Sequence, residues 1–159
     1  MTDNSHEYFM GLAIAEAERG AANGEQPFGA VAVLGGAVIA ATPSLKVSLC
    51  DATAHSETLC AGMATRAAGR RHLPDATFYA TCEPCPMCLG AIFAAGFGTL
   101  VVGARNSDIV IDGRAAFNFH NYSIETFVEM VRWDLTLVTG VRSDECIDLY
   151  ESASVELTR

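Results

Sequence analysis

Three side chains of the types that bind transition metals occur in two short motifs. His55 begins the run His55-Ser56-Glu57, and Cys85 and Cys88 lie in the run Pro84-Cys85-Pro86-Met87-Cys88. Residues three apart in the first turn of a helix share one face, so both sulfurs can bind one tetrahedral ion, with His55 as a further ligand. The motifs therefore predict a zinc site, with Zn2+ as the cofactor.

The number of ligands separates a catalytic zinc site from a structural one. A structural site normally has four Cys or His ligands, whereas three protein ligands leave the fourth position to water. His55, Cys85 and Cys88 make three, which favours catalysis. Cys82 stays open as an alternative fourth ligand, although the junction between a strand and a helix would leave it little room for a tight loop.

Glu57 follows His55 by two residues, which is a separation of about 200° around a helix, so it is badly placed to bind the same ion. Its side chain is long enough to reach a water molecule at the fourth position. It could take a proton from that water and deliver protons to a ring nitrogen and a leaving amine. We therefore expect Glu57 to be a catalytic proton shuttle rather than only an acid that stabilises a helix N-terminus.

Local patterns predict the elements that must position these residues. We expect strands over residues 29–34, 37–41, 77–81, 99–102 and 135–138. We expect helices over residues 5–19, 54–67, 86–95 and 124–131, and a last one from Ser143. Ser123 and Ser143 are the expected caps of the last two helices. The alternation predicts a single α/β domain over residues 1–159, a three-layer α/β/α fold with a mixed sheet of about five strands.

Both metal-binding motifs are expected at helix N-termini, where the partial positive charge favours thiolates over thiols. In residues 104–122, by contrast, the apolar residues do not recur at the regular spacing of a helix or a strand. Their aromatic side chains suit either hydrophobic packing or stacking on a planar ring: Phe117, Phe119, His120 and Tyr122. Whether this segment or the C-terminal helix closes a pocket stays open, and so do the roles of Cys50 and Cys82.

The charge of the chain argues against a polyanionic partner. The formal net charge is −9 and the sequence pI is about 4.7, so the mean surface potential repels nucleic acid and anionic membranes. Arg66, Arg70 and Arg71 form a dense basic cluster, which we interpret as a solvated helix end. We therefore expect a small-molecule heterocyclic amine as substrate, with no nucleic-acid partner.

The compartment is inferred from the N-terminus and the cysteines. The N-terminus lacks the basic start and apolar core of a signal peptide, and no apolar run approaches the roughly 18 residues of a membrane span. We expect a cytoplasmic protein with no membrane partner. The six cysteines should then be reduced, so their spacing indicates metal binding rather than disulfides.

Three motifs carry a family resemblance: Gln26-Pro27-Phe28-Gly29-Ala30, Thr53-Ala54-His55-Ser56-Glu57 and Thr81-Cys82-Glu83-Pro84-Cys85-Pro86-Met87-Cys88-Leu89-Gly90-Ala91-Ile92. In order and spacing the chain resembles the cytidine deaminase-like superfamily, in the branch of guanine deaminases, yeast-type cytosine deaminases and tRNA adenosine deaminases. The resemblance implies His55, Cys85 and Cys88 as zinc ligands and Glu57 as the proton shuttle. It also implies substrate contacts from the Ser56 amide and the Pro84 carbonyl, Phe28 beside the pocket, and a homodimer.

Departures from the family pattern concern the substrate. Many relatives carry a substrate-binding asparagine in the loop before the histidine, where this chain has Ser44 as the candidate substrate contact. Guanine deaminases resemble one another in an aspartate near an aromatic residue, where this chain reads Ala115-Ala116-Phe117-Asn118-Phe119. The usual alanine between histidine and glutamate is Ser56. The motifs thus indicate the reaction, but they do not identify the heterocyclic ring of the substrate.

We therefore expect hydrolytic deamination of a free heterocyclic base, with guanine or a related amino-purine as the leading substrate. Cytosine, an amino-triazine or a nucleoside is the small-molecule alternative. A tRNA adenosine deaminase would share every catalytic residue but is disfavoured by the acidic charge. A non-catalytic, zinc-stabilised binding module is the alternative of another class, and the presence of Glu57 argues against it.

Overall fold

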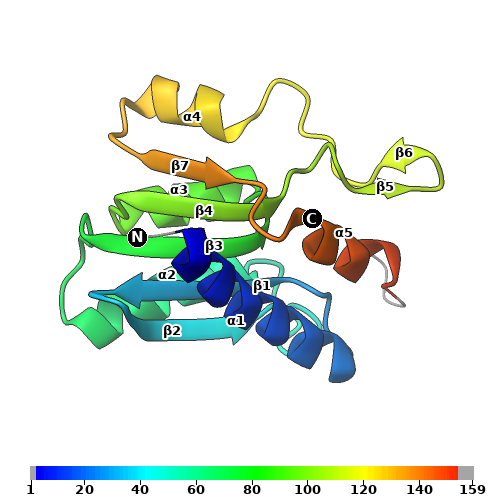
Figure 1. Ribbon diagram of the computed structural model, residues 1–159, viewed down its shortest axis with the longest axis horizontal. Coiled ribbons are helices and arrows are strands. Elements are labelled where there is room, and N and C mark those ends of the chain that lie inside the picture. Colours follow the sequence, from blue (N-terminus) through cyan, green and yellow to red (C-terminus); the bar gives the residue numbers. More distant parts are fainter. Residues whose placement is uncertain (1–2, 154–159) are drawn as a thin grey trace.

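A five-stranded mixed sheet forms the centre of the computed structural model, which describes residues 3–153 (Figure 1). Its order is β2-β1-β3-β4-β7, with these bounds: β1 Gly29–Leu34, β2 Ala37–Pro43, β3 Ala76–Cys82, β4 Thr99–Ala104 and β7 Thr136–Thr139. Strand β1 is antiparallel to both neighbours, whereas β3, β4 and β7 run parallel. The predicted three-layer α/β fold is confirmed.

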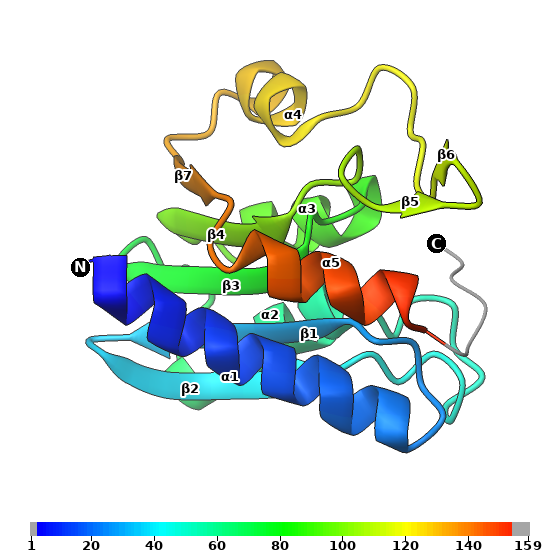
Figure 2. The same cartoon turned by 45° about the vertical axis from the view of Figure 1, so that its right-hand side comes forward.

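Helices cover both faces of the sheet. Helices α1 (Asp3–Ala22) and α5 (Ser143–Glu151) lie on one face, and α2 (Ser56–Ala68) and α3 (Pro86–Ala94) lie on the other (Figures 1 and 2). Helix α4 (Ile124–Val131) lies beside the β7 edge. None of the helices within residues 3–153 is both long enough and apolar enough to cross a lipid bilayer.

The inner strands are buried on both faces because helices pack on each side. Along β1, Ala30 and Ala32 belong to the core under α2 and α3, while Val31 and Val33 belong to the core under α1 and α5. Every residue of β3 is buried. This strand leads directly into the cysteine motif, so the loop that carries the candidate ligands rests on the most buried part of the sheet.

The N-terminal part of the chain depends on a close approach between α1 and β1. A Cβ atom at Gly29 would lie 2.0 Å from the Ala13 carbonyl oxygen and 2.7 Å from the Ala17 nitrogen. Gly29→Ala must push the helix off the sheet, and we expect a loss of about 1–3 kcal/mol or more in the free energy of unfolding. Urea denaturation of the two proteins measures this loss.

A second glycine supplies the control for that prediction. Gly90 lies within α3, and a Cβ atom there would have no neighbour within 4 Å. Gly90→Ala should therefore stabilise the protein by about 0.5–1 kcal/mol, because alanine loses less backbone entropy in a helix. Equal stability of Gly29→Ala and the unaltered protein would contradict the proposed role of the close approach.

Two local expectations have different outcomes. Ser123 caps α4 in a capping box, in which its side chain accepts from the Thr126 amide, so that prediction is confirmed. The prediction that Ser143 caps α5 is wrong. The N-cap is Arg142, which has a left-handed backbone (φ 53°) and makes no side-chain cap. Its guanidinium instead donates to the Glu145 carboxylate, 2.7 Å from Nε to Oε1.

Residues 104–122 contain a small hairpin that the sequence analysis missed. Strands β5 (Val110–Ile111) and β6 (Arg114–Ala115) pair around Asp112-Gly113, both of which have positive φ angles (Figure 2). An Asp-Gly pair is typical of a two-residue hairpin turn, because both positions require positive φ angles. The signal was present, but each strand is only two residues long and has no period to detect.

Candidate active site

The two metal-binding motifs meet at the N-termini of α2 and α3. His55 is the N-cap of α2 and Cys85 is the N-cap of α3, and both have extended backbone conformations. Pro86 occupies the first turn of α3, where its missing N–H has no intrahelical partner. The expectation that both motifs start helices is therefore confirmed, and both helix dipoles place partial positive charge at the site.

The three candidate ligand atoms lie close together and are buried. His55 Nδ1 is 3.3 Å from Cys88 Sγ and 3.8 Å from Cys85 Sγ, and all three atoms lie within 4.8 Å of one another. Ordinary tetrahedral bonds to zinc place a nitrogen and a sulfur ligand about 3.6 Å apart. The three residues therefore fit a zinc ion without rearrangement of the backbone.

The chemistry of the donor set also fits a cation. The pKa of the Cys88 thiol lies above its ordinary value, first because of its hydrogen bond with Cys85, then because of burial and the charge of Glu57. Two adjacent thiolates in a buried site need a positive charge to stabilise them. A divalent ion bound by His55, Cys85 and Cys88 supplies that charge.

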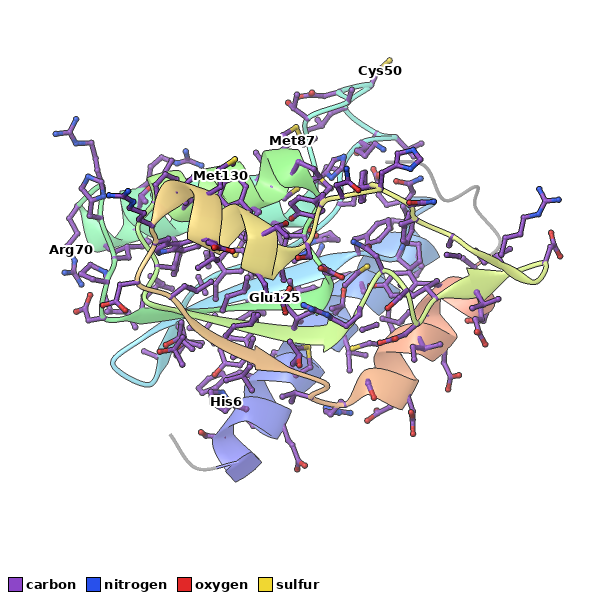
Figure 3. The ribbon with its side chains drawn as sticks, turned by 90° about the horizontal axis from the view of Figure 1, so that it is seen from above. His6, Cys50, Arg70, Met87, Glu125 and Met130 are labelled. Carbon is purple, nitrogen blue, oxygen red and sulfur yellow. The ribbon has the colours of Figure 1, made fainter. Side chains whose placement is uncertain are left out.

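The other cysteines lie outside the cluster. Within residues 3–153, His55, Cys85 and Cys88 are the group of His, Cys, Asp or Glu residues close enough to hold an ion. Cys82 Sγ instead lies 3.6 Å from Asn106 Oδ1, which decides against its role as a fourth ligand. Cys50 is exposed and points away from the molecule, in the loop before α2 (Figure 3).

Glu57 lies beside the candidate metal site, and its role as a proton shuttle stays a prediction. It lies in the first turn of α2, two per cent exposed, and its charge acts on the nearby Cys88 thiol. The Ser56 hydroxyl donates to Glu57 Oε2 at 2.8 Å and so holds the carboxylate in one orientation. The serine that departs from the family pattern therefore contacts Glu57, which its residue type alone did not predict.

The loops expected to contact the substrate lie side by side. The Ser44 amide donates to the Phe28 carbonyl at 2.9 Å, and the Leu45 amide donates to the Ala54 carbonyl at 3.0 Å, next to His55. The Phe28 ring packs against Phe117 and Tyr150, with centroids 5.9 and 5.1 Å away. Phe28 thus supports a wall of the site, and its contact with a substrate stays a prediction, as does that of Ser44.

Tyr122 connects the irregular segment to the cysteine motif. Its hydroxyl donates to the Pro84 carbonyl at 2.5 Å, the group expected to accept a hydrogen bond from the substrate amine. Phe119 packs against the Tyr122 ring edge to face, with centroids 5.8 Å apart. A carbonyl oxygen has two lone pairs, so Tyr122 can orient Pro84 while leaving one for a substrate.

Both segments considered for closing the site lie next to the strand and loop that lead to Cys85. Side chains from the segment 105–123 line a cavity of about 410 Å³ together with Glu83, which lies two residues before Cys85. From α5, the Tyr150 hydroxyl donates to Thr81 Oγ1 at 2.8 Å. Arg105 joins Glu83, at 3.6 Å, to Glu125 on α4, at 2.5 Å. The irregular segment therefore lies against Glu83 and Pro84, and α5 packs on the strand that precedes them.

Glu25 holds the loop that carries Ser44. Its carboxylate accepts from the Val47 amide at 2.9 Å and the Ser48 amide at 2.8 Å. Burial opposes ionisation, but the hydrogen bonds from the Ser48 side chain and from these two amides outweigh it and hold the pKa of Glu25 below its ordinary 4.5. The charged form of Glu25 therefore stabilises the folded protein.

Glu25→Gln should lower the free energy of unfolding by about 1–3 kcal/mol at pH 7, because an amide oxygen accepts these bonds less strongly. A lowered pKa in the folded state gives stability that is present above pH 4.5 and is lost as the pH falls through the folded value. Melting temperatures from pH 7 to 3 should show the two proteins converging. A gap that stays constant with pH would contradict the role of the charge.

Comparisons with known proteins agree with this geometry. Residues 3–104 match the family model described as the cytidine and deoxycytidylate deaminase zinc-binding region. A chloroplastic tRNA(adenine(34)) deaminase of Arabidopsis thaliana is 45% identical over 107 residues, 67% of this chain but 8% of the relative. The tRNA-specific adenosine deaminase of Bacillus subtilis is 35% identical over 140 residues, 88% of this chain and 83% of the relative.

A guanine deaminase of Bacillus subtilis is also similar, with 39% identity over 105 residues, 65% of this chain and 67% of the relative. Among solved structures, one from a study of A-to-I editing by tRNA:A34 deaminases has a TM-score of 0.75 and 34% identity, covering 89% of this chain and 98% of that one. A guanine deaminase structure from Bacillus subtilis has a TM-score of 0.63 and 29% identity, covering 80% and 91%.

These relatives overturn one prediction drawn from composition. The net charge of −9 led us to expect no nucleic-acid partner, yet several similar proteins are named as tRNA deaminases. The inference was wrong because net charge averages over the whole surface, whereas an RNA contacts only the region around the site. The homodimer implied by the family resemblance stays a prediction.

Proposed function

The chain belongs to the cytidine and deoxycytidylate deaminase zinc-binding family, and from this membership we propose that it deaminates adenosine to inosine at the wobble position of a tRNA. One observation carries the choice of substrate. The match to the Bacillus subtilis tRNA-specific adenosine deaminase extends over 140 residues, so it includes part of the chain beyond residue 104. The guanine deaminase match spans 105 residues.

The region beyond residue 104 matters because it borders the site. Tyr122 contacts the Pro84 carbonyl, and Phe117 packs on Phe28, so this segment shapes the space above the metal-binding loop. The two metal motifs are common to deaminases of different substrates. The match to the tRNA-specific adenosine deaminase covers 88% of this chain, against 65% for the guanine deaminase of the same organism, which supports the tRNA substrate.

The site residues can perform the reaction with adenine. His55, Cys85 and Cys88 would hold the zinc ion, which would supply a water made nucleophilic near neutral pH. Glu57 takes a proton from the attacking water and delivers it to ring nitrogen N1 while the oxygen bonds to C6. A second proton passes to the exocyclic amine, the C6–N bond breaks, and ammonia leaves. Water is consumed, inosine and ammonia form, and no oxidant or reductant takes part.

A free purine base is the second candidate, because a guanine deaminase is among the similar proteins. The departures from the family pattern count against it. Ala115 and Ala116 stand in the stretch where guanine deaminases resemble one another in an aspartate, and Ala115 lines the cavity beside Glu83. A carboxylate that could bind the guanine amine is therefore lacking at the matching positions.

A single assay separates the two candidates. Zinc-loaded protein is incubated with a tRNA transcript that has adenosine at the wobble position, with the same transcript carrying guanosine there, and with free guanine. We expect inosine, identified by mass spectrometry of the digested RNA, from the first transcript alone. Xanthine from guanine with no inosine in the RNA would overturn the proposal in favour of the free base.

A further inference from the structure

We infer that the Thr58 hydroxyl donates a hydrogen bond to the Cys88 sulfur and strengthens the hold of the site on its metal ion. Thr58 Oγ1 lies 3.4 Å from Cys88 Sγ, within the range of a hydrogen bond to sulfur. The inference depends on Cys88 as a metal ligand, and it does not depend on which substrate the enzyme deaminates. It assigns a metal-positioning role to a residue outside the two motifs of ligands.

The helix geometry explains why Thr58 reaches the site. It lies three residues after His55, so both project from the same face of the first turn of α2. Cys88 is the third residue of α3 and is completely buried. The contact therefore joins two helices whose N-termini already meet at the metal-binding cluster. Thr58 itself is half-buried, at the outer border of the cluster.

A donor at this position has a direct effect on metal binding. The hydrogen bond fixes the direction of the sulfur lone pairs and disperses part of the negative charge of a bound thiolate. Groups that orient metal ligands in this way typically contribute 10- to 100-fold to metal affinity, roughly. We expect Thr58 to fall within this range, because the Cys88 side chain that receives the bond is completely buried.

A second role of the same side chain must be separated from the first. Thr58 also lines a groove of about 310 Å³ between α2 and α3, together with Gly62, Thr65 and Ala91. Its methyl group could act simply by covering the site against solvent from this groove. Thr58→Val keeps a branched apolar cover and removes the hydroxyl, whereas Thr58→Ser keeps the hydroxyl and removes the methyl group.

The test is a competition for zinc at a fixed pH between the protein and a chromophoric chelator, without substrate. We expect Thr58→Val to bind zinc 10- to 100-fold more weakly, roughly, and Thr58→Ser to retain affinity within about threefold. Replacement of zinc by cobalt adds a spectroscopic readout. The sulfur-to-cobalt charge-transfer band should shift in the valine variant and stay in place in the serine variant.

Thr65→Val is the matched control, because Thr65 lies two turns further along α2 and its hydroxyl donates to the Gly62 carbonyl at 3.0 Å. It should leave zinc affinity unchanged. Unaltered zinc affinity in Thr58→Val, or an equal loss in Thr65→Val, would overturn the inference. Loss in Thr58→Ser with retention in Thr58→Val would assign the effect to the methyl cover instead. None of these outcomes depends on whether tRNA is the substrate.

Discussion

Glu57→Gln is expected to lower kcat for deamination by about 10²–10⁴-fold while leaving one zinc ion bound. Glutamine has the shape of glutamate but cannot carry the proton from water to the ring nitrogen and the leaving amine. The side chain is buried in the first turn of α2 and accepts from the Ser56 hydroxyl, which can also bond to an amide oxygen. The fold should therefore survive, and the loss should appear in kcat rather than in KM.

The measurement is the rate of ammonia release under saturating substrate, with zinc content measured on the same samples. Glu83→Gln is the matched control, because Glu83 is another buried acid, but it accepts from the Asn106 amide and faces Arg105. That variant should lose stability and keep kcat within a few-fold. Equal rates for Glu57→Gln and the unaltered enzyme would exclude Glu57 as the shuttle and the mechanism with it.

Cys88→Ala should abolish activity by releasing the metal. Apparent binding free energies of zinc in sites with four ligands are about 10–16 kcal/mol, so loss of one ligand from three should weaken binding by at least about 10²–10³-fold. Cys88 is completely buried and its sulfur lies 3.3 Å from His55 Nδ1, so alanine leaves this position of the cluster without a protein ligand atom. Metal analysis of the purified variant tests the loss directly.

Cys82→Ala is the informative control for that experiment. Cys82 is also buried and lies in the same motif region, but its sulfur lies beside Asn106. We expect this variant to keep its zinc and its activity, with a loss in stability from the smaller side chain. Loss of zinc from Cys82→Ala would show that the ion has four protein ligands, and a structural role for the site would follow.

The metal centre could be identified from sequence because its parts are local. The spacing of Cys85 and Cys88 within one helical turn and the order His55 then Glu57 fix the relation of these groups wherever the helices lie. Strand and helix positions also followed from short-range periodicity, as for α4, which begins and ends at the predicted residues 124 and 131. Such patterns need only neighbouring residues to be readable.

The tertiary structure decided the surroundings of the metal centre. The contacts of Thr58 with Cys88, Tyr122 with Pro84 and Glu25 with the loop after Ser44 join residues 22 to 38 positions apart. No local sequence pattern predicts such a contact, because each of these side chains taken alone is an ordinary surface or core residue. The N-cap position of α5 was predicted wrongly for a related reason. Arg142 occupies it without a capping side chain, and its guanidinium instead binds the Glu145 carboxylate.

The sequence by itself therefore determined the class of reaction and the candidate ligands of the metal, since both depend on residue type and spacing within a turn of helix. The tertiary structure determined which hydroxyl groups contact Glu57 and Cys88, and which segment lines the cavity beside Glu83. The charge of the whole chain pointed away from RNA, because an average over the surface carries no information about the region around the site. The charge around the site is decided by the side chains that folding brings together there.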